Sequence, residues 1–133
     1  MFFLFDCDNF FVSCERVFAP GLKKRPVVVL SNNDGCVVSR SYEAKALGIP
    51  MGAPYFKIER FFTARGGVAL SSNYELYADM SARVMSVLRS CFSNLEVYSI
   101  DEAFARLPDS ENLEQLAAAI RTRIPVSYTH LTL

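Results

Sequence analysis

The chain opens with Phe2-Phe3-Leu4-Phe5-Asp6-Cys7-Asp8, a short apolar run that ends in two carboxylates. Apolar runs of about four to eight residues bounded by polar residues are typical of buried strands, so residues 2–5 are predicted to form one. Residues 95–100 and 103–107 are also predicted to be strands, and they meet at Asp101-Glu102. Acidic side chains therefore stand at the ends of apolar strand segments that lie far apart in the sequence.

The segments between these two places are predicted to alternate between helix and strand. The clearest pattern lies in residues 73–92, where apolar residues recur every three or four positions, as on one face of a helix. Asn9 precedes an apolar helical stretch and is predicted to be its N-cap. No internal repeat or linker divides the chain, which is therefore predicted to be one α+β unit. Further helices are expected at 10–18, 42–47, 55–61 and 113–124, and further strands at 27–30, 36–39 and 68–70.

The composition excludes several classes of protein. The 133 residues are 51% hydrophobic and 21% charged, which is enough for one soluble domain with its own core. Fourteen basic and fourteen acidic residues cancel, so the net charge gives no sign of a nucleic-acid or membrane partner. The four cysteines lack paired spacing, and there is one histidine, so neither a zinc site nor a disulfide framework is indicated.

The apolar start does not have the pattern of a targeting segment. Asp6 interrupts it early and no basic stretch precedes it, unlike a signal peptide. No apolar run approaches the ~20 residues that a membrane-spanning helix needs. A cytoplasmic protein without a membrane partner is expected.

The acidic residues indicate metal chemistry if they meet in the fold. Two carboxylates about 4 Å apart repel by about 4 kcal/mol at an effective dielectric near 20, so Asp6, Asp101 and Glu102 would need a cation or raised pKa values. Oxygen ligands without His or Cys side chains favour Mg²⁺. Two such ions about 3.5–4 Å apart can stabilise both the attacking and the leaving oxygen of a displacement.

Other interpretations of these residues stay open. Taken alone, Asp6 or Asp8 is typical of a helix cap, and Asp101-Glu102 is typical of an acidic turn. A Mg²⁺-dependent phosphatase of the haloacid-dehalogenase type is an alternative, with Asp6 as nucleophile. Phe10 stands where that family usually has Thr or Val, and no later Lys fits its pattern. A non-catalytic interaction module, which would bind no Mg²⁺ at the acidic residues, is a third possibility.

Five blocks of sequence, taken in order, resemble Y-family DNA polymerases, in particular their UmuC-type branch. The resemblance implies an α+β fold with a mixed or antiparallel palm sheet, helices on one face of it, and a small fingers subdomain at roughly 20–75. Residues 1–124 would form a partial palm and fingers, and thus an incomplete domain. Residues 125–133 depart from the family pattern and are interpreted as a divergent or truncated tail. The blocks are residues 5–15, 26–37, 43–48, 71–81 and 98–104.

The resemblance also implies the ligands of a metal centre. Asp6, Asp101 and Glu102 match the palm carboxylates that ligate two Mg²⁺ ions, and the backbone carbonyl of Cys7 matches a further ligand. These are the same three carboxylates that the electrostatic argument singles out.

Three further residues match the family's nucleotide-binding positions. Phe11 matches the steric gate, an aromatic ring packed where a ribose 2′-hydroxyl would lie. Tyr42 and Lys45 match fingers residues that bind the incoming triphosphate through a hydroxyl and a positive charge. Without the resemblance, Phe11 would be interpreted as a core residue, and Tyr42 and Lys45 as an exposed helical turn.

The function implied is that of a translesion DNA-directed DNA polymerase in SOS-type DNA repair. Such an enzyme transfers a nucleotidyl group from a dNTP to the primer 3′-hydroxyl of primer-template DNA. UmuD-type accessory subunits, RecA and the sliding clamp would be partners of the intact protein. Because the family's DNA-gripping domains do not appear in these 133 residues, the chain alone is expected to have negligible activity.

Overall fold

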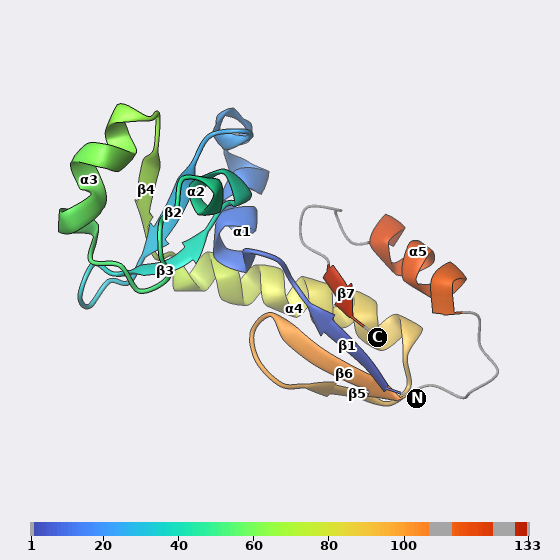
Figure 1. Ribbon diagram of the computed structural model, residues 1–133. Helices are drawn as coiled ribbons and strands as arrows, with labels where there is room; N and C mark the ends of the chain where they lie inside the picture. The colour runs from blue at the N-terminus through green and yellow to red at the C-terminus, as the bar shows by residue number, and fades with distance from the viewer. Residues whose placement is uncertain (1, 107–112, 124–129, 133) are drawn as a thin grey trace. The chain divides into compact units, whose positions relative to one another are not determined.

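The computed structural model describes residues 2–106, 113–123 and 130–132. Two compact units make up the chain (Figure 1). The first unit consists of Met1–Asp8 and Glu75–Leu133, and the second unit is the continuous segment Asn9–Tyr74. Each unit has its own β-sheet.

The sheet of the first unit has the strand order β5-β6-β1-β7, with every neighbouring pair antiparallel. Its strands join the start of the chain to segments about a hundred residues later. The last of them, β7, was not predicted from the sequence. The strands are β1 (Phe2–Asp6), β5 (Leu95–Val97), β6 (Glu102–Arg106) and β7 (His130–Thr132), and the helices are α4 (Tyr74–Cys91), which begins in the second unit, and α5 (Leu113–Arg123).

One face of this sheet is covered and the other is more open. Phe5 pairs with Ala103 across β1 and β6, and both side chains are buried. The ring of Phe92, just after α4, lies 5.1 Å from that of Phe5, so α4 packs on this face. Side chains alternate between faces along a strand, and the next pair, Leu4 and Phe104, is only half-buried. The sheet therefore has one core face and one partly exposed face.

The sheet of the second unit is mixed and has the order β3-β2-β4. The central strand β2 pairs antiparallel with β3 and parallel with β4. With the first unit's antiparallel sheet, this confirms the predicted α+β fold built from antiparallel and mixed sheets. The strands are β2 (Val27–Leu30), β3 (Val37–Arg40) and β4 (Val68–Ser71), and the helices are α1 (Phe10–Phe18), the 3₁₀ turn η1 (Pro20–Leu22), α2 (Tyr42–Ala46) and α3 (Tyr55–Ala64).

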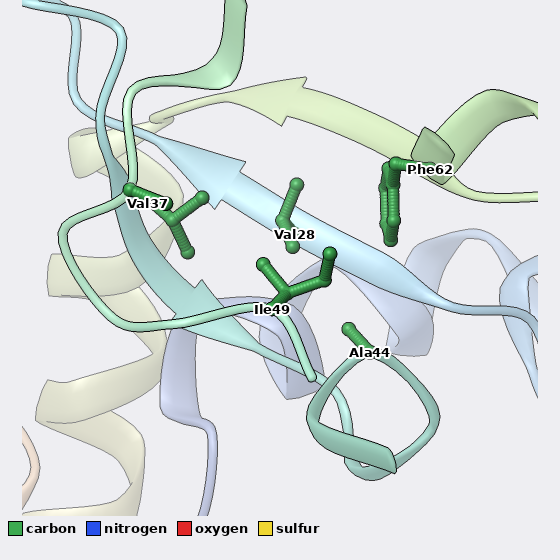
Figure 2. Close-up of a cluster of buried hydrophobic side chains, with 6 residues drawn as sticks. Val28, Val37, Ala44, Ile49 and Phe62 are labelled. Carbon is green, nitrogen blue, oxygen red and sulfur yellow. The ribbon is translucent and has the colours of Figure 1, made fainter. Parts of the chain in front are cut away.

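Strand β2 is buried on both faces. Figure 2 shows Val28 among Val37, Ala44, Ile49 and Phe62, which come from β3, α2, the segment after α2, and α3. The other face of the sheet lies against α1, whose Val12 N–H donates to Ser39 Oγ of β3 at 3.4 Å. Burial on both faces explains why β2 is an unbroken apolar run, rich in β-branched residues, rather than an alternating one.

The predicted N-cap of the first helix is confirmed in position but not in its capping hydrogen bond. Asn9 occupies the N-cap position of α1, but its side chain makes no capping hydrogen bond. Its backbone is left-handed, with φ 48° and ψ 47°, whereas a capping side chain works from an extended backbone. Asn tolerates this conformation better than most residues, so here it makes a tight turn between β1 and α1.

The four cysteines are reduced thiols of two kinds. Cys7 and Cys14 are buried, and Cys36 and Cys91 are partly exposed. Burial, helped by the charge of Glu15, raises the pKa of the Cys14 thiol to about 12. Cys14 therefore stays protonated and unreactive at neutral pH, while Cys36 in the second unit and Cys91 in the first are the accessible thiols.

An ion pair ties α1 to α2. Arg16 Nη2 lies 3.1 Å from Glu43 Oε2 and 2.8 Å from the carbonyl oxygen of Arg25. Partial burial opposes ionisation of Glu43, but the hydrogen bonds from its own backbone N–H and from Arg16 outweigh it. The pKa of Glu43 therefore lies below its ordinary 4.5.

Glu43→Gln should lower the free energy of unfolding by about 1 kcal/mol at pH 7, because the pair is partly exposed and partly screened. The lowered folded-state pKa of Glu43 stabilises the fold above the unfolded value, and this stabilisation is lost as the pH falls below about 4.5. Urea denaturation should therefore show the difference at pH 7 and little of it near pH 3. Glu59→Gln, at an exposed position on α3, is the matched control and should leave stability unchanged at both pH values.

Candidate active site

Two of the predicted acidic residues lie directly opposite each other in the first unit. Asp6, the last residue of β1, is the cross-strand partner of Glu102, the first residue of β6. Directly opposed residues of an antiparallel pair project from the same face, so both carboxylates belong to the more open face of the sheet. Both residues are half-buried.

The third acidic residue is brought to the same end of the sheet by the backbone. Cys7 N–H donates to the carbonyl oxygen of Asp101 at 2.9 Å, which extends the contact between the two segments just beyond the paired strands. Cys7 keeps its thiol buried. The structure thus places Asp6, Cys7, Asp101 and Glu102 together at one end of β1 and β6.

Ser99 connects two of the carboxylates. Its Oγ lies 2.9 Å from Asp101 Oδ1 and 3.1 Å from Glu102 Oε2, so one hydroxyl proton is shared between two acidic acceptors. This serine was not among the predicted site residues, although the spacing Ser-x-Asp-Glu is visible in the sequence. A hydroxyl two residues before an acidic pair is the signal that would have found it.

The turn that carries Ser99 is held from two sides. The N–H groups of Tyr98 and Ser99 both donate to the carbonyl oxygen of Glu102, at 3.0 and 3.1 Å. Ser81, buried on α4, donates its hydroxyl to the carbonyl oxygen of Ile100. The position of the acidic pair is therefore set by hydrogen bonds within its own turn and by α4.

The carboxylates do not form a ready-made metal cage. Within residues 2–106, 113–123 and 130–132, no group of three or more His, Cys, Asp or Glu side chains is placed to hold a metal ion. The available donors at this end of the sheet are nonetheless carboxylate, hydroxyl and carbonyl oxygens, which suit a hard divalent cation. The donor chemistry fits Mg²⁺.

The predicted steric-gate residue lies in the second unit. Phe11 is in the first turn of α1 and is half-buried. Its ring meets that of Tyr74 edge-on, with centroids 6.2 Å apart, and lies 6.2 Å from the ring of Phe10. Contacts with these two rings restrict the orientation of Phe11.

The two predicted triphosphate ligands lie side by side on α2. Lys45 Nζ is 5.1 Å from the centroid of the Tyr42 ring, and both side chains are exposed. Helix α2 is anchored by Ser41, whose buried Oγ accepts from Ala44 N–H at 3.1 Å and from Val27 N–H of β2 at 2.9 Å. A phenol and an ammonium group are thus presented together from a helix fixed to the central strand.

The pattern that defines the impB/mucB/samB family matches residues 5–132 of this chain. The chain belongs to this family. It is 53% identical to the protein UmuC of Salmonella typhimurium over 99% of its own length, and 34% identical to DNA polymerase IV of Metallosphaera sedula over 90% of it. The resemblance to Y-family translesion DNA polymerases of the UmuC type is therefore confirmed.

Solved structures of other proteins have the same fold. DinB from Sulfolobus solfataricus superposes with a TM-score of 0.85 at 30% identity, covering 98% of this chain and 41% of that one. An insertion ternary complex of Dbh DNA polymerase gives a TM-score of 0.84 at 28% identity, covering 99% and 42%.

The family member described here spans only part of its relatives. It covers 32% of the length of UmuC and 36% of that of the DNA polymerase IV. The family match runs through residue 132, into the segment that was predicted to be divergent. Among the helices that the structure describes, none is long and apolar enough to cross a lipid bilayer.

Proposed function

We propose that this chain carries the nucleotidyl-transfer centre of a translesion DNA polymerase. The observation that supports it most directly is the placement of Asp6 opposite Glu102, with Asp101 joined to Cys7 by a backbone hydrogen bond. The named relatives include DNA polymerases, and they lend no support to the phosphatase or interaction-module alternatives.

Asp6, Asp101, Glu102 and the Cys7 carbonyl would hold two Mg²⁺ ions. When bound, these ions would offset phosphate charge and polarise the primer 3′-oxygen. The protein's own contribution is to fix the carboxylates before substrate arrives, and the shared Ser99 hydroxyl spreads their negative charge before a cation binds.

The second unit would select and hold the nucleotide. The ring of Phe11, restrained by Phe10 and Tyr74, would exclude a ribose 2′-hydroxyl and so favour deoxynucleotides. The Tyr42 hydroxyl would donate a hydrogen bond to the triphosphate, and Lys45 would supply a positive charge.

The wider setting proposed is SOS-type repair in the cytoplasm. Primer-template DNA and dNTPs would be the substrates, and UmuD-type subunits, RecA and the sliding clamp would be partners of the intact polymerase. Residues 1–124 are proposed to form part of the palm and the fingers, with the fingers at roughly 20–75. The 133-residue chain alone is proposed to be inactive.

Activity can be tested in a chimera in which this chain replaces the matching segment of Salmonella typhimurium UmuC. The UmuC chimera should extend a primer under the conditions in which unaltered UmuC does, while the chain alone should not. A soluble, folded chimera that binds primer-template DNA without extending the primer would contradict the proposal.

Ser99→Ala should reduce the rate of nucleotide insertion by the UmuC chimera about tenfold, because a hydrogen-bonded supporting group typically contributes about 10- to 100-fold. The Mg²⁺ concentration for half-maximal activity should rise, since the carboxylates lose the group that orients them. Ser99→Thr keeps the hydroxyl and should restore most of both. An unchanged Mg²⁺ dependence of activity in Ser99→Ala would show that Ser99 does not orient the carboxylates.

Lys45→Gln should raise the KM for dNTP in the UmuC chimera about tenfold, because a charge-assisted hydrogen bond to phosphate contributes about 1.5–3 kcal/mol. Lys45→Arg should retain most of the affinity. Single-nucleotide insertion kinetics measure both, with Lys23→Gln, at an exposed lysine of the same unit, as the control. Equal KM values for Lys45→Gln and Lys23→Gln would show that Lys45 does not bind the triphosphate.

A further inference from the structure

Helix α3 has an outer face that the fold of the second unit does not use. Its inner side packs Phe62 into the core, with Tyr55 and Ile58 against that core. On the outer side Phe56 is 77% exposed and Phe61 is 42% exposed. Single exposed apolar residues are ordinary, but two exposed phenylalanines on one short helix need an explanation beyond folding.

Positive charges accompany both rings. Phe56 and Arg60 are four residues apart, as are Lys57 and Phe61, so these side chains are neighbours on the helix surface. Lys57 Nζ lies 5.8 Å from the centroid of the Phe56 ring, and Arg65 Cζ lies 3.6 Å from that of Phe61. The outer face therefore presents two aromatic rings, each with a cation beside it.

The second unit is strongly basic, although the whole chain is neutral. Residues 9–74 contain nine Lys and Arg against four Asp and Glu, a net charge of +5, and the rest of the chain carries five against ten, a net charge of −5. Four of the nine cations bond within the unit. Arg16 pairs with Glu43, and the guanidinium groups of Arg25, Arg40 and Arg65 donate to the carbonyl oxygens of Gly66, Ile49 and Phe61 respectively. The cations of α3 are exposed.

We propose that the outer face of α3 binds single-stranded nucleic acid. Exposed rings offer platforms on which unpaired bases stack, and neighbouring cations neutralise the phosphates. A duplex hides its base faces, and an apolar protein partner would not match the cations that lie beside both rings. None of its residues is among the carboxylates or is Tyr42 or Lys45, so the proposal does not rest on the proposed polymerase activity. The outer face consists of Phe56, Lys57, Arg60, Phe61 and Arg65.

Fluorescence anisotropy of a labelled oligo-dT of about twenty nucleotides, titrated with the 133-residue chain, tests the proposal without dNTP or metal. Phe56→Ala combined with Phe61→Ala should raise the Kd at least about tenfold, since each stacked base contributes on the order of a tenfold change or more. Both side chains are exposed, so the melting temperature should hardly change, which separates lost binding from lost folding.

A matched pair of charge variants separates a local site from diffuse attraction. Lys57→Gln with Arg60→Gln should weaken binding and make the slope of log Kd against log salt concentration shallower, by about 0.7 for each phosphate that is no longer neutralised. Lys23→Gln with Lys24→Gln removes the same charge from an exposed part of the same unit and should change the Kd less than about threefold.

Three results would overturn the proposal. One is an equal loss of affinity in the two charge variants, and another is duplex DNA bound as tightly as oligo-dT. The third is binding of the chain to anionic lipid vesicles that depends on Phe56 and Phe61, with no such dependence for oligo-dT. The last result would assign the outer face of α3 to a membrane surface.

Discussion

Asp101→Asn in the UmuC chimera should lower nucleotide insertion by about 10²- to 10³-fold while leaving primer-template binding nearly unchanged. The amide has almost the shape of the carboxylate but no negative charge, so it cannot balance a divalent cation at this end of the sheet. Glu102→Gln should behave similarly, because Glu102 stands opposite Asp6 and shares the Ser99 hydroxyl with Asp101. Primer-extension rates measured at saturating dNTP and Mg²⁺ test both variants.

Asp8→Asn is the matched control for these carboxylates. Asp8 follows the same strand and is half-buried like Asp6, but it is not among the proposed ligands. It should keep near-full polymerase activity. A loss in Asp8→Asn as large as that in Asp101→Asn would contradict the assignment of the metal-binding role to Asp6, Asp101 and Glu102 without Asp8.

Phe62→Ala should destabilise the second unit by about 3–5 kcal/mol, the cost of removing a buried aromatic ring and leaving a cavity. Phe62 is fully buried in the core of this unit, and its ring meets that of Tyr55 edge-on at 6.5 Å. The chain also passes so close to this ring at Gly67 that a Cβ there would lie 2.5 Å from it. Urea denaturation followed by circular dichroism measures the loss.

The neighbouring residue supplies the control for this prediction. Phe61→Ala removes the same ring from the outer side of the same helix, where it is 42% exposed, and should cost less than about 1 kcal/mol. Similar costs for the two variants would mean that α3 does not present Phe62 to the core as described.

Much of this fold could be predicted because its local patterns agree with its tertiary structure. The unbroken apolar run of β2 is the pattern of a strand buried on both faces, and the three-and-four spacing of residues 73–92 corresponds to α4, Tyr74–Cys91. The apolar run before Asp6 predicted β1 for the same reason. In each case, the pattern that favours the local backbone conformation also places the apolar side chains where the fold buries them.

What could not be predicted depends on contacts between distant residues or on charges summed over a surface. Strand β7 forms by pairing with β1, more than a hundred residues earlier, which no local pattern in residues 130–132 reveals. Ser99 is a different case, because its partners Asp101 and Glu102 are only two and three residues away and the spacing was visible in the sequence. The charge of the second unit was hidden because the acidic first unit cancels it, and counting over the whole chain averages the two.

The distribution of thiols makes this protein ready for spectroscopic labelling. A maleimide dye pair would attach at Cys36 and Cys91, one per unit, and would leave Cys7 and Cys14 untouched inside the cores. Energy transfer between the dyes would then follow, molecule by molecule, whether the two units approach or separate when nucleic acid or nucleotide is added.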